Sequence, residues 1–354
     1  MKSFLEMPKH THGLLIIPNK EYHEDNNFLG STGVKNWLKN PFIAQKTLEK
    51  KEQDKLNDDV DKETKEAFRF GSFYHSLILE PETTDTEFYV INPENRPDKA
   101  HTMASNANKA WAASFDDGVR TKMSIKDYDK ILEMKDVLFE YSTPDYSIKK
   151  MIVQDNRPEE SFFCEDFVTL IRDRKEFDKY EFHSDFNASY YVEDTTLKDA
   201  VECKMTETGK WVIYNEDLSK LMKESIVSVN SKVRPDINTS LFIGDLKTCQ
   251  SNDLYKWKRA VADRDYDLSA SYYIDVYYCL TGKRKPFWWI TQEKNFPFNV
   301  EVYNVSDGYL ENGRYKYLSG IFRLLKYKVT GNLEGYIQKP INQFAITVEP
   351  ERWS

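Results

Sequence analysis

The sequence predicts an α/β fold with a helical region at the amino terminus, and two observations carry this prediction. The chain has 354 residues, of which 40% are apolar and 14% aromatic, so it is long enough to bury a substantial core. Segments typical of buried strands, at 227–233 and 241–243, occur among segments of helical periodicity at 66–79, 266–278 and 309–327. We therefore expect one elaborated domain over residues 1–354 rather than independent modules.

The helix expected over 66–79 combines an apolar stripe with a polar neighbouring face. Gly71 and His75, one turn apart, lie on that neighbouring face, and a glycine inside a helix indicates the close passage of a strand or of a nucleic-acid backbone. A histidine in this position is either a hydrogen-bonded, half-buried side chain or a ligand. The charged run at 50–66 predicts a solvated helix extension or a linker. The stripe consists of Ala67, Phe70, Tyr74, Leu77 and Ile78.

Two aspartates and a lysine between residues 232 and 248 form the strongest candidate site. Side chains alternate along an extended chain, so Asp245 and Lys247 share one face while Leu246 points into the core. Asp236 follows the strand expected at 227–233, and the turn-like composition after it predicts a hairpin that brings Asp236 close to Asp245. Two carboxylates suit Mg²⁺ or Mn²⁺, and a neighbouring lysine can orient a water molecule. The pattern indicates phosphodiester hydrolysis.

An acid-x-Lys triplet by itself is a weak signal, because most exposed triplets of this kind are solvated strand edges. The chain contains a second one, Glu202-Cys203-Lys204, with Asp194 eight residues upstream of Glu202. The context of each triplet in the sequence is what separates the two.

The charge balance requires any nucleic-acid contact to be local. The formal net charge is −8, which argues against a protein that binds nucleic acid over its whole surface, because such affinity depends on neutralising phosphates. A helix is expected to begin near Ser251, a good N-cap residue, and its cations would lie close to the edge of the candidate site. The DNA-binding candidates on it are Lys256, Lys258 and Arg259.

The motifs also occur in a recognisable order along the chain. They are Gly71 to Pro81 around His75, then Arg234-Pro235-Asp236, then Gly244 to Thr248, then 266–273, with further likeness at 17–23 and 287–300. The set resembles the nuclease domain of the RecE-type exonucleases (exodeoxyribonuclease VIII), which belong to the PD-(D/E)XK superfamily. The resemblance covers most of residues 15 to 350. It implies a PD-(D/E)XK core, which is a mixed central β-sheet flanked by helices.

The resemblance also implies roles for individual residues. His75, Asp236, Asp245 and the Leu246 backbone carbonyl would hold Mg²⁺, for which Mn²⁺ can substitute, and Lys247 would assist the attacking water.

Three other residues matter by the same resemblance. Tyr273 keeps the place of a family tyrosine, with a plain core aromatic as the alternative. Relatives carry a glutamine four residues before it, where this chain has Ser269, which is too short to make the same contacts. Glu160 or Glu224 would supply a further acid, and Glu160 is favoured because the residues after it resemble the family's first core strand.

The resemblance divides the chain as well. Residues 1–150 would be a mainly helical part that carries the histidine motif, 151–305 the catalytic sheet, and 306–354 a carboxy-terminal helix and tail. The distance from Glu160 to Asp236 indicates an insertion at about 167–226.

The implied activity is that of a metal-dependent exonuclease. It would digest linear double-stranded DNA from its ends, 5′ to 3′, and leave single strands for a RecT-like annealing partner, in a phage or prophage recombination system. A homo-oligomeric ring is implied too. Two alternatives remain: an endonuclease of the same superfamily that serves restriction or defence, and a non-catalytic DNA-binding relative.

The cysteines and the hydropathy predict the compartment. The four cysteines form no Cys-x-x-Cys pair and are expected to be reduced thiols. No signal peptide and no segment apolar enough to span a membrane is evident, which predicts a cytoplasmic protein.

Overall fold

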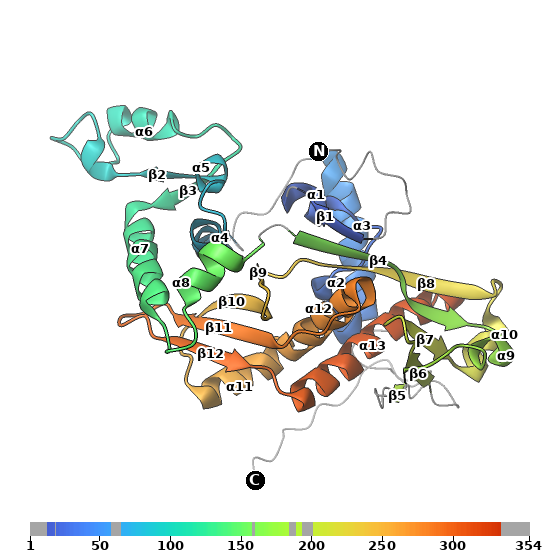
Figure 1. Ribbon diagram of the computed structural model, residues 1–354. Helices are drawn as coiled ribbons and strands as arrows, with labels where there is room; N and C mark the ends of the chain where they lie inside the picture. Colours follow the sequence, from blue (N-terminus) through green and yellow to red (C-terminus); the bar gives the residue numbers. More distant parts are fainter. Residues whose placement is uncertain are drawn as a thin grey trace, which may run out of the picture.

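Two mixed β-sheets lie at the centre of the computed structural model, which describes residues 13–17, 19–57, 65–157, 160–183, 189–192 and 201–333 (Figure 1). The larger sheet has the order β1-β4-β7-β6-β5, with β8 paired to β4, and the smaller has the order β12-β11-β10-β9. The pairs β4–β7 and β10–β11 are parallel, whereas β4–β8 and β11–β12 are antiparallel. The expected α/β architecture with mixed sheets flanked by helices is confirmed.

The strands of the larger sheet are β1 (Gly13–Ile16), β4 (Glu160–Ile171), β5 (Ser189–Val192), β6 (Val201–Met205), β7 (Trp211–Tyr214) and β8 (Ile226–Val233). Those of the smaller sheet are β9 (Ile237–Asn238), β10 (Ile243–Cys249), β11 (Phe287–Glu293) and β12 (Val300–Asn304).

Three helices cover the larger sheet. α12 (Tyr266–Thr281) packs on β4 and β8, and both α13 (Asp307–Thr330) and α2 (Ser31–Lys39) pack against α12 and against each other. In this core the ring of Tyr272 packs edge to face on Phe167, with centroids 5.8 Å apart, and on Tyr317, with centroids 5.4 Å apart. The helices expected at 266–278 and 309–327 are therefore confirmed. Among the described residues, no helix is both long and apolar enough to cross a membrane.

A second core joins the amino-terminal helices to the smaller sheet. α4 (Lys65–Leu79) buries Phe73, Tyr74 and Ile78 together with residues of α7 (Ile125–Glu140) and with Leu246 of β10. The helix expected at 66–79 is confirmed. The other elements of this part are α5 (Thr84–Glu87), α6 (Asn106–Ala113), and the parallel pair β2 (Phe88–Ile91) and β3 (Thr121–Ser124).

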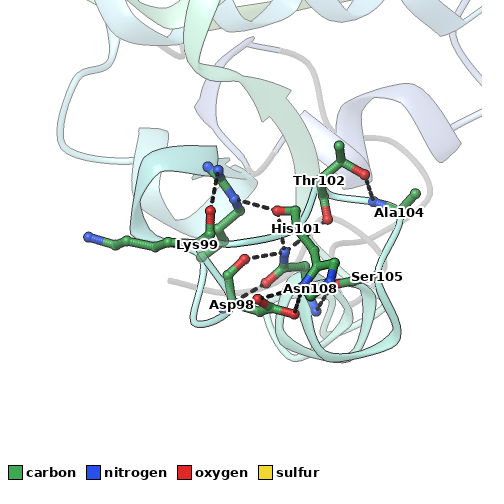
Figure 2. A network of polar contacts seen from close by, with 8 residues as sticks. Asp98, Lys99, His101, Thr102, Ala104, Ser105 and Asn108 are labelled. Carbon is green, nitrogen blue, oxygen red and sulfur yellow. Dashed lines mark hydrogen bonds and ion pairs between the residues drawn. The ribbon is translucent and has the colours of Figure 1, made fainter.

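The segment between β2 and α6 is held by one buried asparagine. The Asn108 side chain donates to the carbonyl oxygens of Asp98, His101 and Thr102 and accepts from the Asp98 N–H (Figure 2). Because one amide contacts four backbone groups, residues 98–102 have a defined path outside helices and strands. The remaining helices are α1 (Asn19–Glu24), α3 (Pro41–Asn57), η2 (Pro93–Asn95), α8 (Ile148–Lys150), η3 (Met151–Asp155), α9 (Arg174–Phe177) and α10 (Glu216–Leu221).

Residues 167–226, expected as an insertion, are built into the larger sheet. β4 continues to Ile171, and β5, β6 and β7 extend the same sheet. Cys203 and Trp211 lie in the same buried core as Phe167. The second acid-x-Lys triplet lies on β6, where Glu202 pairs with Lys204 at 2.6 Å, and Asp194 lies outside the described residues.

Two local expectations need adjustment. The first helix after the triplet, α11 (Leu254–Asp263), is capped by Asp253 rather than Ser251, because the Asp253 carboxylate accepts from the N–H groups of Tyr255 and Lys256 at 3.1 Å and 3.2 Å. In the charged run at 50–66, α3 extends to Asn57, and 58–64 lie outside the described residues.

Replacing Gly313 with alanine is expected to destabilise the protein by about 1–3 kcal/mol through overpacking. A Cβ atom at Gly313 of α13 would lie 2.1 Å from the Asp267 carbonyl oxygen of α12, so the two helices would have to separate. Gly308→Ala in the same helix is the matched control, because a Cβ there meets nothing within 4 Å. Urea unfolding measures both. Equal midpoints for the two variants would contradict the close approach of α12 and α13.

Cys164 and Cys279, which are 115 residues apart, meet across β4 and α12 with their sulfur atoms 2.8 Å apart, and the structure records both as free thiols. We expect oxidised glutathione to link them, the two thiols giving up two protons and two electrons to the reagent's disulfide. Intact mass and peptide mapping would detect the bond. Cys203 and Cys249 are the internal controls, and a Cys164–Cys279 peptide that stays reduced would contradict the contact.

Candidate active site

The two aspartates meet where the chain passes from one sheet to the other. β8 belongs to the larger sheet, so the expected hairpin is made not by β8 but by the two-residue strand β9, which pairs antiparallel with β10. Asp236 directly precedes β9, and its Oδ2 accepts a hydrogen bond from the Leu246 N–H at 2.9 Å. Leu246 is fully buried, so Asp245 and Lys247 share the opposite face, as the alternation predicts.

Lys247 connects the two carboxylates. Its Nζ lies 2.6 Å from Oδ1 of Asp245 and 3.7 Å from Oδ2 of Asp236. Burial raises the pKa of Asp245 to about 7, and the Asp236 charge adds to this shift against the opposing effect of Lys247. Burial lowers the pKa of Lys247, but the two carboxylates outweigh it and raise that pKa above its ordinary value. The site therefore holds two carboxylates and one ammonium group in mutual contact.

His75 reaches the same point from α4. Its Nδ1 lies 3.5 Å from Oδ2 of Asp236, and its ring forms a hydrogen bond with the Leu246 backbone. Burial, together with the charge of Lys247, lowers the His75 pKa to about 4, so the imidazole is neutral at pH 7 and can act as a ligand. A Cβ at Gly71 would meet no atom within 4 Å, so no strand passes there, and Gly71 borders open space instead.

That open space is a cleft of about 950 Å³. His75, Asp236 and Lys247 line it, and they keep 28%, 22% and 25% of their side-chain surface exposed. A substrate can therefore reach them. Pro235 and Thr248, which flank the two acidic positions, line the same cleft.

Tyr273 lies on the cleft wall. Burial raises its pKa, as do the negative charges of Asp245 and Asp236, and its hydroxyl forms a hydrogen bond with Ser31 of α2. Its ring also packs edge to face on Phe287 at 6.2 Å, so it contributes both to the core and to the cleft. Ser269 is buried and does not line the cleft.

The two candidate acids lie apart from this pair. Glu160 is buried at the start of β4, where its Oε2 accepts from Asn238 Nδ2 at 2.5 Å and its Oε1 lies 3.7 Å from Arg157 Nη1. Among the contacts of the described residues, none joins Glu160 to Asp236 or Asp245, and Glu160 does not line the cleft. Glu224 is exposed and precedes β8, whereas Asp236 follows it, so the length of this strand separates the two.

The three DNA-binding candidates on α11 do not reach the cleft. Lys256, Lys258 and Arg259 are exposed, and the cleft contains none of them. Other cations line it instead, among them Arg264 and Lys294, which sequence reasoning did not single out. Arg264 immediately follows α11 and Lys294 follows β11, and no sequence pattern marks either position.

The donor atoms suit a divalent cation. Two clustered carboxylates, a neutral imidazole and a backbone carbonyl are ligands that Mg²⁺ and Mn²⁺ accept. Burial raises the pKa of Asp245, so a bound cation would favour its ionised form. Among the residues that the structure describes, no three His, Cys, Asp or Glu side chains already stand as a metal site, and the Lys247 ammonium contacts both carboxylates. The residues fit the ion in chemical type.

Comparison with known proteins bears on the same segment. The family model described as a PDDEXK-like domain of unknown function matches residues 159–334. Asp236, Asp245, Lys247 and Tyr273 all lie within the matched segment, whereas His75 is supplied by α4 from outside it.

Two further comparisons concern the whole chain. The chain is similar to the crystal structure of a putative exonuclease from Eubacterium rectale, with 13% sequence identity, a TM-score of 0.44, and coverage of 93% of this chain and 97% of that one. No curated protein matches the chain significantly.

Proposed function

We propose that this protein is a metal-dependent nuclease that hydrolyses the phosphodiester bonds of DNA. The observation that carries the proposal is the convergence of Asp236, Lys247 and a neutral His75 at the cleft, with Asp245 in contact with Lys247 directly behind them. These four groups come from α4, β10 and the β8–β9 link, so tertiary folding brings together residues with no other common role. The segment that contains three of them matches the model of a PDDEXK-like domain, which supports the same chemistry.

Each residue has a distinct part in the proposed reaction. His75, Asp236, Asp245 and the Leu246 carbonyl would hold Mg²⁺ or Mn²⁺, which when bound activates water and neutralises charge on the phosphate. The Leu246 N–H fixes one Asp236 oxygen, so that carboxylate is oriented in advance. Lys247 donates hydrogen bonds toward the attacking water or the developing phosphate charge. Tyr273, which is hydrogen-bonded to Ser31, offers a hydroxyl on the cleft wall.

The finer proposal concerns the substrate. By resemblance to the RecE-type exonucleases, the substrate would be an end of linear duplex DNA, degraded 5′ to 3′, and the product a single strand for a RecT-like annealing protein. The same resemblance supports Mg²⁺ as the ion, a cytoplasmic location and a homo-oligomeric ring, which would provide processivity.

Glu160 would act on the site through Asn238, two residues after Asp236.

One digestion experiment tests these statements together. Linear and closed circular duplexes are incubated with Mg²⁺, and the linear DNA carries separate labels at its 5′ and 3′ ends. Mononucleotide release with early loss of the 5′ label, and with intact circles, is expected. Early loss of the 3′ label would reverse the polarity, and cut circles would indicate an endonuclease. No cleavage by either Mg²⁺ or Mn²⁺ would contradict the nuclease and favour a role in binding alone.

A further inference from the structure

Three cations surround a single aromatic ring beside the acidic pair. The Nζ atoms of Lys35 and Lys247 lie 5.5 Å and 5.9 Å from the centroid of Tyr266, and Arg264 Nη1 donates to the Tyr266 hydroxyl at 3.2 Å. The three come from α2, β10 and the end of α11. Lys35 also donates to the Arg264 carbonyl oxygen at 3.0 Å, which ties the two elements together.

Of these three cations, only Lys247 forms ion pairs with carboxylates of the described residues. Lys247 contacts Asp245 and Asp236, and the nearby Asp265 is shared by Lys39 and Lys316. Within the described part of the chain, no carboxylate lies at ion-pair distance from Lys35 or Arg264. Burial is the main cause that lowers the pKa of Lys35 to about 8; Asp245 opposes this shift and the charge of Lys247 adds to it. The lowered pKa is consistent with a positive charge that has no partner anion here.

The positive charge continues along the cleft to Lys294. Lys294 lines the cleft with Arg264 and Tyr266, its Nζ lies 5.4 Å from the centroid of Phe70, and no carboxylate among the described residues pairs with it. Burial lowers its pKa, and the charges of Lys130 and Arg264 lower it further. Gathering like charges on one wall is unfavourable unless an anion occupies it. Among the described residues, neither Arg264 nor Lys294 forms an ion pair with Asp236 or Asp245, so these two cations are separate from the acidic pair.

We propose that Arg264 and Lys294, reinforced by Lys35, bind a backbone phosphate of the DNA that flanks the phosphate to be cleaved. This inference rests on the proposed nuclease function and adds the path of the substrate. Arg264 offers a planar, multiply donating guanidinium whose orientation Tyr266 holds, and Lys294 acts as a compact charge. The DNA backbone would then follow the cleft, not the exposed face of α11 with Lys256 and Lys258.

The test is the salt dependence of binding, which needs no cleavage. A fluorescein-labelled duplex is titrated with the metal-free protein, and the affinity is followed by anisotropy at several salt concentrations. Arg264→Gln and Lys294→Met should each reduce the slope of log K against log salt by about 1, because each removes one phosphate contact. Lys35→Met should weaken binding in the same direction. With Mg²⁺, KM should rise while kcat is retained, because these residues do not touch the reacting atoms.

Lys256→Met and Lys258→Met on α11 are the matched controls and should leave the slope unchanged. Lys294 is half-buried and lies in a loop, outside the helices and strands. Lys294→Met therefore still tests the proposal if Lys35→Met disturbs folding. Wild-type slopes in Arg264→Gln and Lys294→Met, in a protein that still cleaves DNA, would overturn the subsite alone. A wild-type protein that neither binds nor cleaves DNA would overturn the nuclease function and the subsite together.

Discussion

Lys247→Met is expected to lower the rate of DNA cleavage by about 10²-fold or more, the scale for removing one group that stabilises charge in a transition state. Methionine keeps much of the length of the side chain but cannot donate to the water or the phosphate. It also leaves the Asp236 and Asp245 carboxylates without the ammonium that now contacts both. The rate is measured on end-labelled linear duplex with Mg²⁺, and circular dichroism confirms the fold.

The chain supplies its own control for this substitution. Lys204 lies 2.6 Å from Glu202 in the second acid-x-Lys triplet, the same distance as from Lys247 to Asp245. That triplet lies on β6, and neither residue lines the cleft. Lys204→Met should therefore cleave DNA at the wild-type rate. If both variants retain full activity, the triplet on β10 is not catalytic.

Asp275→Ala is expected to destabilise the protein by about 3–5 kcal/mol, the cost of removing one partner of a buried ion pair. The Asp275 carboxylate of α12 accepts from Arg314 of α13 at 2.8 Å and 2.9 Å and from the Tyr317 hydroxyl at 2.6 Å. Only 8% of the Arg314 side chain and 2% of that of Asp275 are exposed. Alanine would leave a buried guanidinium without its carboxylate, and urea unfolding would measure the loss.

Two further variants establish the cause of that loss. Asp178→Ala removes a partner of Arg174 from an exposed pair, so it should shift the unfolding midpoint far less. The double replacement Asp275→Leu with Arg314→Met removes both charges and should recover part of the stability that Asp275→Ala loses. An unchanged midpoint for Asp275→Ala would show that the pair does not hold α12 to α13. Because α12 also carries Tyr273, a loosened α12 should reduce cleavage as well.

Much of the candidate site follows from local pattern. The alternation of side chains in a strand predicts that Asp245 and Lys247 share a face while Leu246 is buried, and β10 confirms it. The apolar periodicity predicts α4, α12 and α13, and therefore places His75 and Tyr273 on helices. These features depend on residues within a few positions of one another, so a single sequence contains the information they need.

Only the tertiary structure decided which distant segments meet. It separates β8 and β10 into two sheets and leaves the short β9 to form the hairpin that positions Asp236. It brings Arg264 and Lys294 to the cleft, places Lys35 beside Arg264 and Tyr266, and leaves Lys256 and Lys258 outside the cleft. The physical reason is that such contacts depend on how helices and sheets pack to bury their apolar faces, which no local periodicity specifies.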